Sequence, residues 1–208
     1  KLLRETNGQA ECNLFKAMGL DYIYVDHGND VGELIEAFQS VKDSKKPVVV
    51  HINTLKGKGY APAEQNKEVW HYNGPFHIET GEPLYEMTEE DYSDISMNYL
   101  LDKMKKDPAV VAITSGTPTV IGFTEDKRKE AGKQFVDVGI AEETAVALAS
   151  GIAANGGKPV YGVYSTFVQR TYDQIAQDLC INNSPATIVT FCGSVYGMND
   201  VTHLGLYD

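Results

Sequence analysis

The sequence has few cysteines, and their spacing does not suggest a metal site. The three residues, Cys12, Cys180 and Cys192, lie far apart in 208 residues and include no CxxC pair. An odd number at such spacing argues against the disulfide framework of a small secreted domain. We therefore expect small buried side chains in a reducing compartment.

Long apolar runs and an excess of basic residues are also lacking. No apolar run approaches the roughly 20 residues that a membrane-spanning helix needs. Lys and Arg number 18 against 29 Asp and Glu, which gives a formal net charge of −11. Surfaces that bind nucleic acid or anionic membranes need clustered Lys and Arg. The composition argues against both kinds of partner and favours a cytoplasmic protein.

The first third of the sequence predicts a strand–helix–strand unit. Apolar strand candidates lie at 22–25 and 47–54. Asp30, followed three residues later by Glu33, predicts the start of the intervening helix. Apolar residues recur at helical spacing at Val31, Leu34, Ile35, Phe38 and Val41. Continuous apolar strands of this kind are typical of buried parallel sheets.

The middle of the chain, from residue 56 to about residue 90, is rich in Gly and Pro and loses periodicity. Four large apolar side chains are too many for a solvated linker: Trp70, Tyr72, Phe76 and Ile78. We expect an ordered segment that connects two domains.

A second alternating series follows. It predicts helices at 93–106, 142–154 and 172–182 and strands at 109–114, 134–139, 158–164 and 186–192. Alternation of this length predicts a doubly wound, largely parallel α/β sheet. Ligands of such sheets bind beyond the carboxyl ends of the strands. Several polar residues follow predicted strands, at Tyr60, Glu142, 164–170 and 199–203.

Two local features carry more than one interpretation. Glu142 and Glu143 interrupt an apolar run where a strand leads into a helix, either as functional acids or as acids stabilised by the helix dipole. The glycine-rich segment LKGKGY could bring Lys56 and Lys58 to a phosphate, or leave them solvated.

Five segments occur in one order along the chain: KGKGYAPAE, WH, DVGIAEE, YSTFVQRTYDQ and THLG. This order resembles the 1-deoxy-D-xylulose-5-phosphate synthase family of thiamine-diphosphate enzymes, within the transketolase superfamily. The resemblance covers nearly the whole chain, from about Leu14 to the end. The resemblance implies that a diphosphate-binding and a pyrimidine-binding domain hold the cofactor between them. It assigns residues 1–80 to the end of the first domain, 81–92 to a linker and 93–208 to a truncated second domain.

The resemblance also implies roles for the matched residues. Glu142 would hydrogen-bond N1′ of the aminopyrimidine, so that the exocyclic nitrogen can remove the thiazolium C2 proton. Phe167 would stack on the pyrimidine, and Tyr60 would line the cofactor site. His71 and His203 would exchange protons with reacting carbonyls.

Substrate binding would fall to Tyr164, Arg170 and Asn199. Arg170 suits the phosphate of glyceraldehyde 3-phosphate, because a guanidinium binds phosphate through two hydrogen bonds. Each of these roles has an ordinary structural alternative, such as core packing for Phe167 or a surface position for Arg170. Glu143 is assigned only a structural role.

The function implied is the condensation of pyruvate with glyceraldehyde 3-phosphate to 1-deoxy-D-xylulose 5-phosphate, with release of CO₂. Such a transferase of isoprenoid biosynthesis would be a homodimer that uses thiamine diphosphate and Mg²⁺. The metal motif would lie upstream of this chain, so no metal ligand is assigned. The chain is expected to be a fragment that does not catalyse alone.

Two departures keep other functions open. Asn199 stands where the family has an aspartate, and Thr144 follows the two glutamates where members commonly have GIAEQH. An amide cannot act as a carboxylate base. A transketolase that moves two-carbon units between sugar phosphates, and a non-catalytic paralogue module, therefore remain alternatives.

Overall fold

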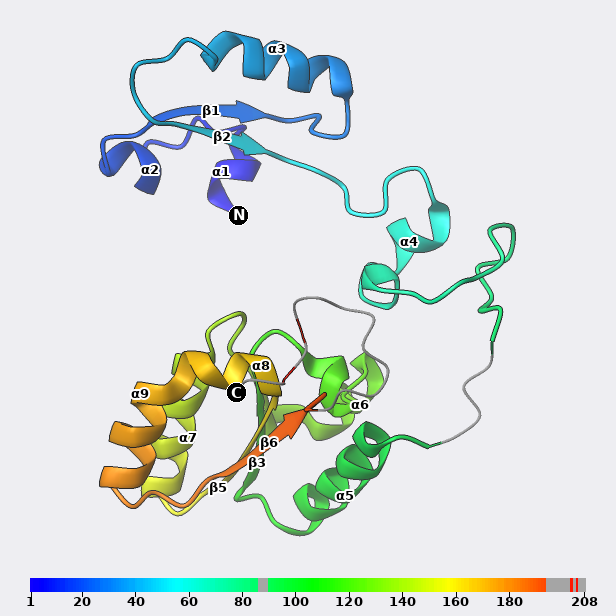
Figure 1. The fold of residues 1–208 in the computed structure, drawn as a ribbon, viewed down its shortest axis with the longest axis vertical. Coiled ribbons are helices and arrows are strands. Elements are labelled where there is room, and N and C mark those ends of the chain that lie inside the picture. Colours follow the sequence, from blue (N-terminus) through cyan, green and yellow to red (C-terminus); the bar gives the residue numbers. More distant parts are fainter. Residues whose placement is uncertain (86–89, 194–202, 204, 206–208) are drawn as a thin grey trace. The chain divides into compact units, whose positions relative to one another are not determined.

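The computed structural model describes residues 1–85, 90–193, 203 and 205. The chain divides into two compact units, residues 1–87 and 88–208 (Figure 1). This division falls inside the predicted linker, 81–92, while the assignment of each unit to a particular domain stays a prediction.

The first unit contains a two-stranded parallel sheet with a connecting helix, as predicted. The elements are α1 (Leu2–Glu5), α2 (Leu14–Ala17), β1 (Asp21–Val25), α3 (Val31–Val41), β2 (Val48–Ile52), α4 (Ala61–Gln65) and the 3₁₀ turn η1 (Val69–His71). The Asp30 carboxylate accepts a hydrogen bond from the backbone N–H of Glu33 at 3.1 Å. The predicted start of α3 is therefore confirmed.

Within the described residues, the burial expected of the strands in this unit is wrong, and the apolar face of the helix between them is exposed. The apolar stripe of α3 is largely in solvent, since Val31, Ile35 and Phe38 are 50–69% exposed. Strand β2 is only half-buried along its length. The spacing of apolar residues predicts which face of a helix is apolar, but two strands offer too little surface to cover it.

The three cysteines are a second correction. Cys12, Cys180 and Cys192 are all exposed free thiols rather than buried side chains. The number and spacing of cysteines predict whether disulfides form, but the burial of each side chain depends on tertiary packing.

The segment after β2 is ordered around an aromatic cluster. The ring centroids of Tyr60 and Trp70 lie 5.0 Å apart, and Phe76 lies 4.8 Å from Trp70. Tyr72 and Ile78 are exposed instead. The prediction of an ordered segment is confirmed for the residues in this cluster.

The second unit is a four-stranded parallel sheet with strand order β4-β3-β5-β6. Its strands are β3 (Val110–Thr114), β4 (Phe135–Asp137), β5 (Lys158–Tyr164) and β6 (Thr187–Phe191). Its helices and turns are α5 (Tyr92–Lys106), η2 (Pro118–Ile121), α6 (Glu125–Ala131), η3 (Gly132–Gln134), α7 (Glu142–Ala154), α8 (Ser165–Val168), η4 (Gln169–Thr171), α9 (Tyr172–Gln174) and η5 (Ile175–Ile181). The predicted α/β fold class, a doubly wound and largely parallel sheet, is confirmed.

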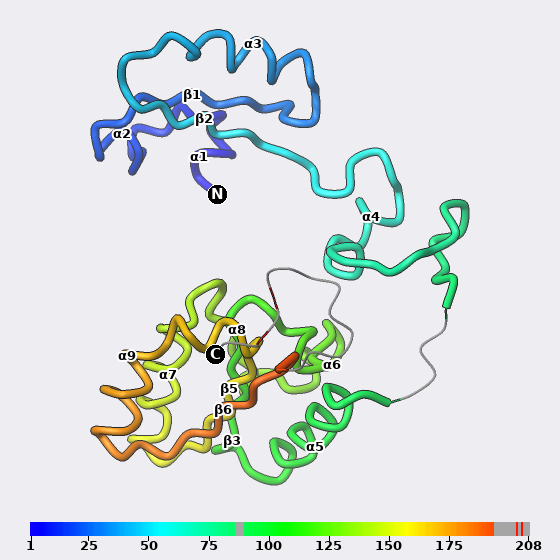
Figure 2. Tube along the Cα trace, viewed as in Figure 1, coloured from blue at the N-terminus to red at the C-terminus, as the bar shows by residue number. Residues whose placement is uncertain are grey.

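Helices cover both faces of this sheet. One face packs against α5 and α6, and the other against α7, α9 and η5 (Figures 1 and 2). Successive residues of β3 serve opposite faces, because Ala112 belongs to the core under α5 and Ile113 to the core under α7. The predicted helix at 172–182 is present as α9 followed by the π-helical segment η5.

The described residues include no helix long and apolar enough to cross a membrane.

Gly162 on β5 provides a test of this packing. A methyl group added there would lie 2.1 Å from Cγ2 of the buried Ile121. We expect Gly162→Ala to lower the free energy of unfolding by about 1–3 kcal/mol, because the overpacked core must shift. Urea unfolding of the chain measures the change.

Gly151→Ala is the matched control. Gly151 lies in α7, and no atom lies within 4 Å of the added methyl group. This variant should raise stability by about 0.5–1 kcal/mol. Equal stability of Gly162→Ala and the wild type would contradict the packing described.

Candidate functional site

The centre of the candidate site is Glu142, the first residue of α7. Its side chain is only 3% exposed, although it is an acid in the first turn of a 13-residue helix. The helix dipole favours a negative charge at this end. Burial nevertheless removes the carboxylate from water, so it needs a partner from the protein or from a ligand.

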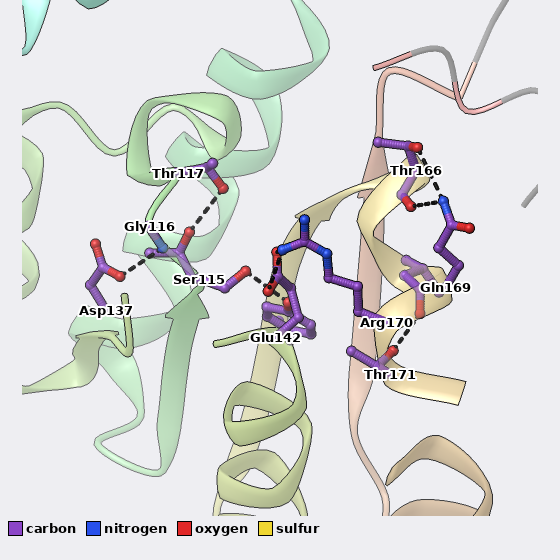
Figure 3. A network of polar contacts seen from close by, with 12 residues as sticks. Ser115, Gly116, Thr117, Asp137, Glu142, Thr166, Gln169, Arg170 and Thr171 are labelled. Carbon is purple, nitrogen blue, oxygen red and sulfur yellow. Dashed lines mark hydrogen bonds and ion pairs between the residues drawn. The ribbon is translucent and has the colours of Figure 1, made fainter. Parts of the chain in front are cut away.

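Asp137, at the end of β4, holds the loops that lead to Glu142. Its Oδ1 accepts hydrogen bonds from the backbone N–H groups of Gly116 and Gly139, each at 2.8 Å. Figure 3 shows Asp137 reaching Gly116. Both glycines have positive φ angles, 78° and 73°. One carboxylate therefore ties the loop after β3 to the loop that enters α7.

The partner of Glu142 is Arg170. Its Nη1 lies 3.1 Å from Oε1 and 3.2 Å from Oε2 of the carboxylate (Figure 3). Arg170 comes from η4, and 45% of its side chain remains exposed. The pair therefore joins a buried carboxylate to a guanidinium that is still partly exposed to solvent.

Phe167 contacts this ion pair, and Tyr164 and His203 pack against Phe167. The Arg170 guanidinium carbon lies 4.8 Å from the ring centroid of Phe167, which is a cation–π contact. The ring of His203 lies 5.3 Å from Tyr164 and 5.1 Å from Phe167. Five of the residues selected from the sequence are thus brought together in the second unit.

The other three selected residues are placed differently. Tyr60 belongs to the first unit, where its hydroxyl donates to the carbonyl of Ile78 at 3.0 Å. His71, also in that unit, contacts the ammonium of Lys56 through Nδ1. Asn199 lies outside the described residues. The roles assigned to all three stay predictions.

Ser115 and Tyr161 form a buried pair that sequence reasoning missed. Ser115 Oγ and the Tyr161 hydroxyl lie 2.8 Å apart, and both residues are buried. Tyr161 alternates with core residues along β5, so the sequence indicated only packing. The alternation does not indicate that its hydroxyl forms a hydrogen bond with Ser115, the residue that follows β3.

Burial is the main cause that raises the pKa of Tyr161 to about 12. The charges of Glu142 and Glu143 raise this pKa further, while the Ser115 hydrogen bond and Arg170 oppose the shift. The hydroxyl therefore stays protonated below pH 10 and remains a neutral partner of Ser115.

The buried carboxylate of Glu142 could hold a cofactor, but the described residues show no metal site. Among the described residues, no group of three or more His, Cys, Asp or Glu side chains is placed to hold a metal ion.

Comparison with known proteins places the chain in a family. Residues 89–208 match the model of the transketolase pyrimidine-binding domain. The chain belongs to this family, a class of domains whose name states that they bind pyrimidine. Residues 3–54 match the model described as 1-deoxy-D-xylulose-5-phosphate synthase.

Curated relatives agree with the second match. The chain is 41% identical over 196 residues to 1-deoxy-D-xylulose-5-phosphate synthase 1 of Geobacter sulfurreducens and to the synthase of Natranaerobius thermophilus. Each alignment covers 94% of this chain but 31% of the relative. The resemblance inferred from the motifs is confirmed, and the chain spans about a third of the length of these relatives.

A search of solved structures gives a weaker match. It is to a split-gene transketolase described as an inactive beta4 tetramer, with 18% sequence identity and a TM-score of 0.40. The match covers 47% of this chain and 33% of that chain.

The ion pair makes a prediction about stability. Arg170→Ala leaves a buried carboxylate without its guanidinium, and we expect the free energy of unfolding to fall by about 1–3 kcal/mol. The value lies below that of a fully buried pair because water reaches the arginine side. Arg170→Lys should recover part of the loss in urea unfolding. A wild-type stability for Arg170→Ala would mean that Glu142 does not depend on this pair.

The raised pKa of Tyr161 makes a prediction about pH. The neutral hydroxyl contributes stability that is fully present below pH 10 and lost as the pH rises toward 12. We expect the stability difference between wild type and Tyr161→Phe to shrink by about 2 kcal/mol across this range. Urea unfolding at several pH values measures the difference. A pH-independent difference would contradict the burial of this hydroxyl.

Proposed function

We propose that this chain is part of a thiamine-diphosphate-dependent transferase that condenses pyruvate with glyceraldehyde 3-phosphate to 1-deoxy-D-xylulose 5-phosphate and releases CO₂. The observation that carries the proposal is the buried carboxylate of Glu142, which Arg170 links to the ring of Phe167, in a domain of the transketolase pyrimidine-binding family. The identity of 41% to curated synthases supports the choice of reaction.

The residues of the second unit fit the aminopyrimidine of the cofactor. A buried carboxylate suits a ring nitrogen that must carry a proton, because a low local dielectric strengthens the hydrogen bond between them. The face of Phe167 suits a flat heteroaromatic ring. When bound, the cofactor supplies the carbon nucleophile that attacks the donor and the electron sink that accepts its electron pair.

The residues of the site then have the following roles in the reaction. Glu142 holds the proton at N1′, while Arg170 and Tyr164 bind the phosphorylated acceptor together with Asn199. His203 exchanges a proton with the oxygen of a reacting carbonyl, a role that its position beside Tyr164 and Phe167 supports.

Several features of the whole protein belong to the same proposal. Tyr60 would line the cofactor site, His71 would exchange a proton with a reacting carbonyl, and the whole protein would bind Mg²⁺. The enzyme would be a cytoplasmic homodimer that acts in isoprenoid biosynthesis and binds neither nucleic acid nor membrane.

Turnover of the full-length protein tests the proposal. Supplied with thiamine diphosphate, Mg²⁺, pyruvate and glyceraldehyde 3-phosphate, it should release CO₂ and form 1-deoxy-D-xylulose 5-phosphate. Glu142→Gln should lower kcat by about 100-fold or more, because the amide cannot hold the proton at N1′ as a carboxylate does.

Glu143→Gln is the matched control, since Glu143 is the exposed neighbour on the same helical turn. It should retain wild-type kcat. Two-carbon transfer from a ketose phosphate without CO₂ would instead indicate a transketolase. Absence of both reactions would indicate a non-catalytic module.

A further inference from the structure

We propose that Arg170 and the aminopyrimidine of the cofactor compete for the same carboxylate and the same ring face, so that cofactor binding releases Arg170 for a phosphorylated substrate. This inference rests on the proposed function, which assigns Glu142 and Phe167 to the cofactor. It adds a coupling between the two binding events.

The contacts of Arg170 coincide with those proposed for the pyrimidine. One nitrogen, Nη1, is within hydrogen-bond distance of both oxygens of Glu142, at 3.1 and 3.2 Å. The same guanidinium lies over the ring of Phe167, 4.8 Å from its centroid. A pyrimidine that bonds to Glu142 and stacks on Phe167 needs the volume that the guanidinium fills.

The two partners differ in their freedom to move. Glu142 is fixed at the first turn of α7 with 3% of its side chain exposed, whereas 45% of the Arg170 side chain is exposed. The head group of Arg170 already reaches water, so its charge can be hydrated when another partner replaces it at Glu142. Arg170 is therefore the partner that moves away.

The backbone that carries Arg170 is held independently of the ion pair. The Thr171 hydroxyl donates to the carbonyl of Val168 at 2.7 Å, and Thr171 is buried. The Gln169 amide donates to the carbonyl of Thr166 at 2.6 Å (Figure 3). These bonds keep η4 in place, so the exchange requires only a rotation of the arginine side chain.

The exchange couples the two ligands. While Arg170 pairs with Glu142, a substrate phosphate must compete with a carboxylate for the guanidinium. Once the pyrimidine occupies Glu142, the guanidinium is available for two hydrogen bonds to phosphate. Because such coupling is reciprocal, the phosphate ligand also tightens cofactor binding by the same factor.

Cofactor affinity tests the competition. We would titrate the full-length protein with thiamine diphosphate in the presence of Mg²⁺ and follow binding by calorimetry. Arg170→Ala removes the competitor and should lower Kd by about 10-fold. Lys133→Ala removes one exposed positive charge elsewhere and should leave Kd unchanged. An unchanged or higher Kd in Arg170→Ala would overturn the inference.

Arg170→Lys guards against a folding defect in the alanine variant. It keeps the positive charge but loses the planar guanidinium over Phe167, so it should give a Kd between those of wild type and Arg170→Ala. Equal Kd values for wild type and Arg170→Lys would contradict the inference.

Glycerol 3-phosphate tests the coupling without turnover. In the wild type, saturating thiamine diphosphate should tighten its binding about 10-fold. In Glu142→Gln, which weakens the hold on Arg170, glycerol 3-phosphate should bind more tightly without the cofactor, and the cofactor should add little. Equal affinities with and without cofactor in the wild type would overturn the inference alone. A wild type that binds no thiamine diphosphate would overturn the proposed function as well.

Discussion

The carboxylate of Glu142 is held out of water at the first turn of α7, and a buried charge of this kind must be partnered. Asp137 fixes the loops that place it. Arg170 supplies the opposite charge from a turn whose backbone is anchored separately. The arrangement of this end of the sheet therefore follows from the need to satisfy one acid.

The constraint also links structure to chemistry. A carboxylate in water would exchange its partners with solvent, and its hydrogen bond to a ring nitrogen would be weak. In the proposed function, the same group, held out of water at a helix N-terminus, accepts a charge-assisted hydrogen bond from the cofactor, and Phe167 provides a stacking face. In the proposed exchange, the partially exposed arginine keeps the acid paired until a ligand replaces it.

Much of the second unit could be predicted from the sequence. The helix at 142–154 and the strand at 158–164 occur at the predicted residues, because small residues at helical spacing end at Gly156-Gly157 and an apolar strand follows. The helix α3 occurs where it is predicted, but its apolar stripe is exposed, since periodicity identifies an apolar face and not the element that covers it. The π-helical geometry of Ile175–Ile181 has no signature in residue type.

The site could be predicted in composition but not in pairing. Ordered motifs selected Glu142, Phe167 and Arg170, yet the bond between Glu142 and Arg170 depends on a turn and a side-chain rotation that no motif encodes. The Ser115–Tyr161 pair depends on the register of β3 and β5, which spacing along one strand does not reveal.

The most direct measurement is a crystal structure of the full-length protein with thiamine diphosphate and Mg²⁺. The account predicts that an oxygen of Glu142 lies about 2.5–2.9 Å from N1′ of the cofactor, with Phe167 against the pyrimidine and the guanidinium of Arg170 turned toward solvent. A structure in which the cofactor is bound and Arg170 still pairs with both oxygens of Glu142 would contradict it.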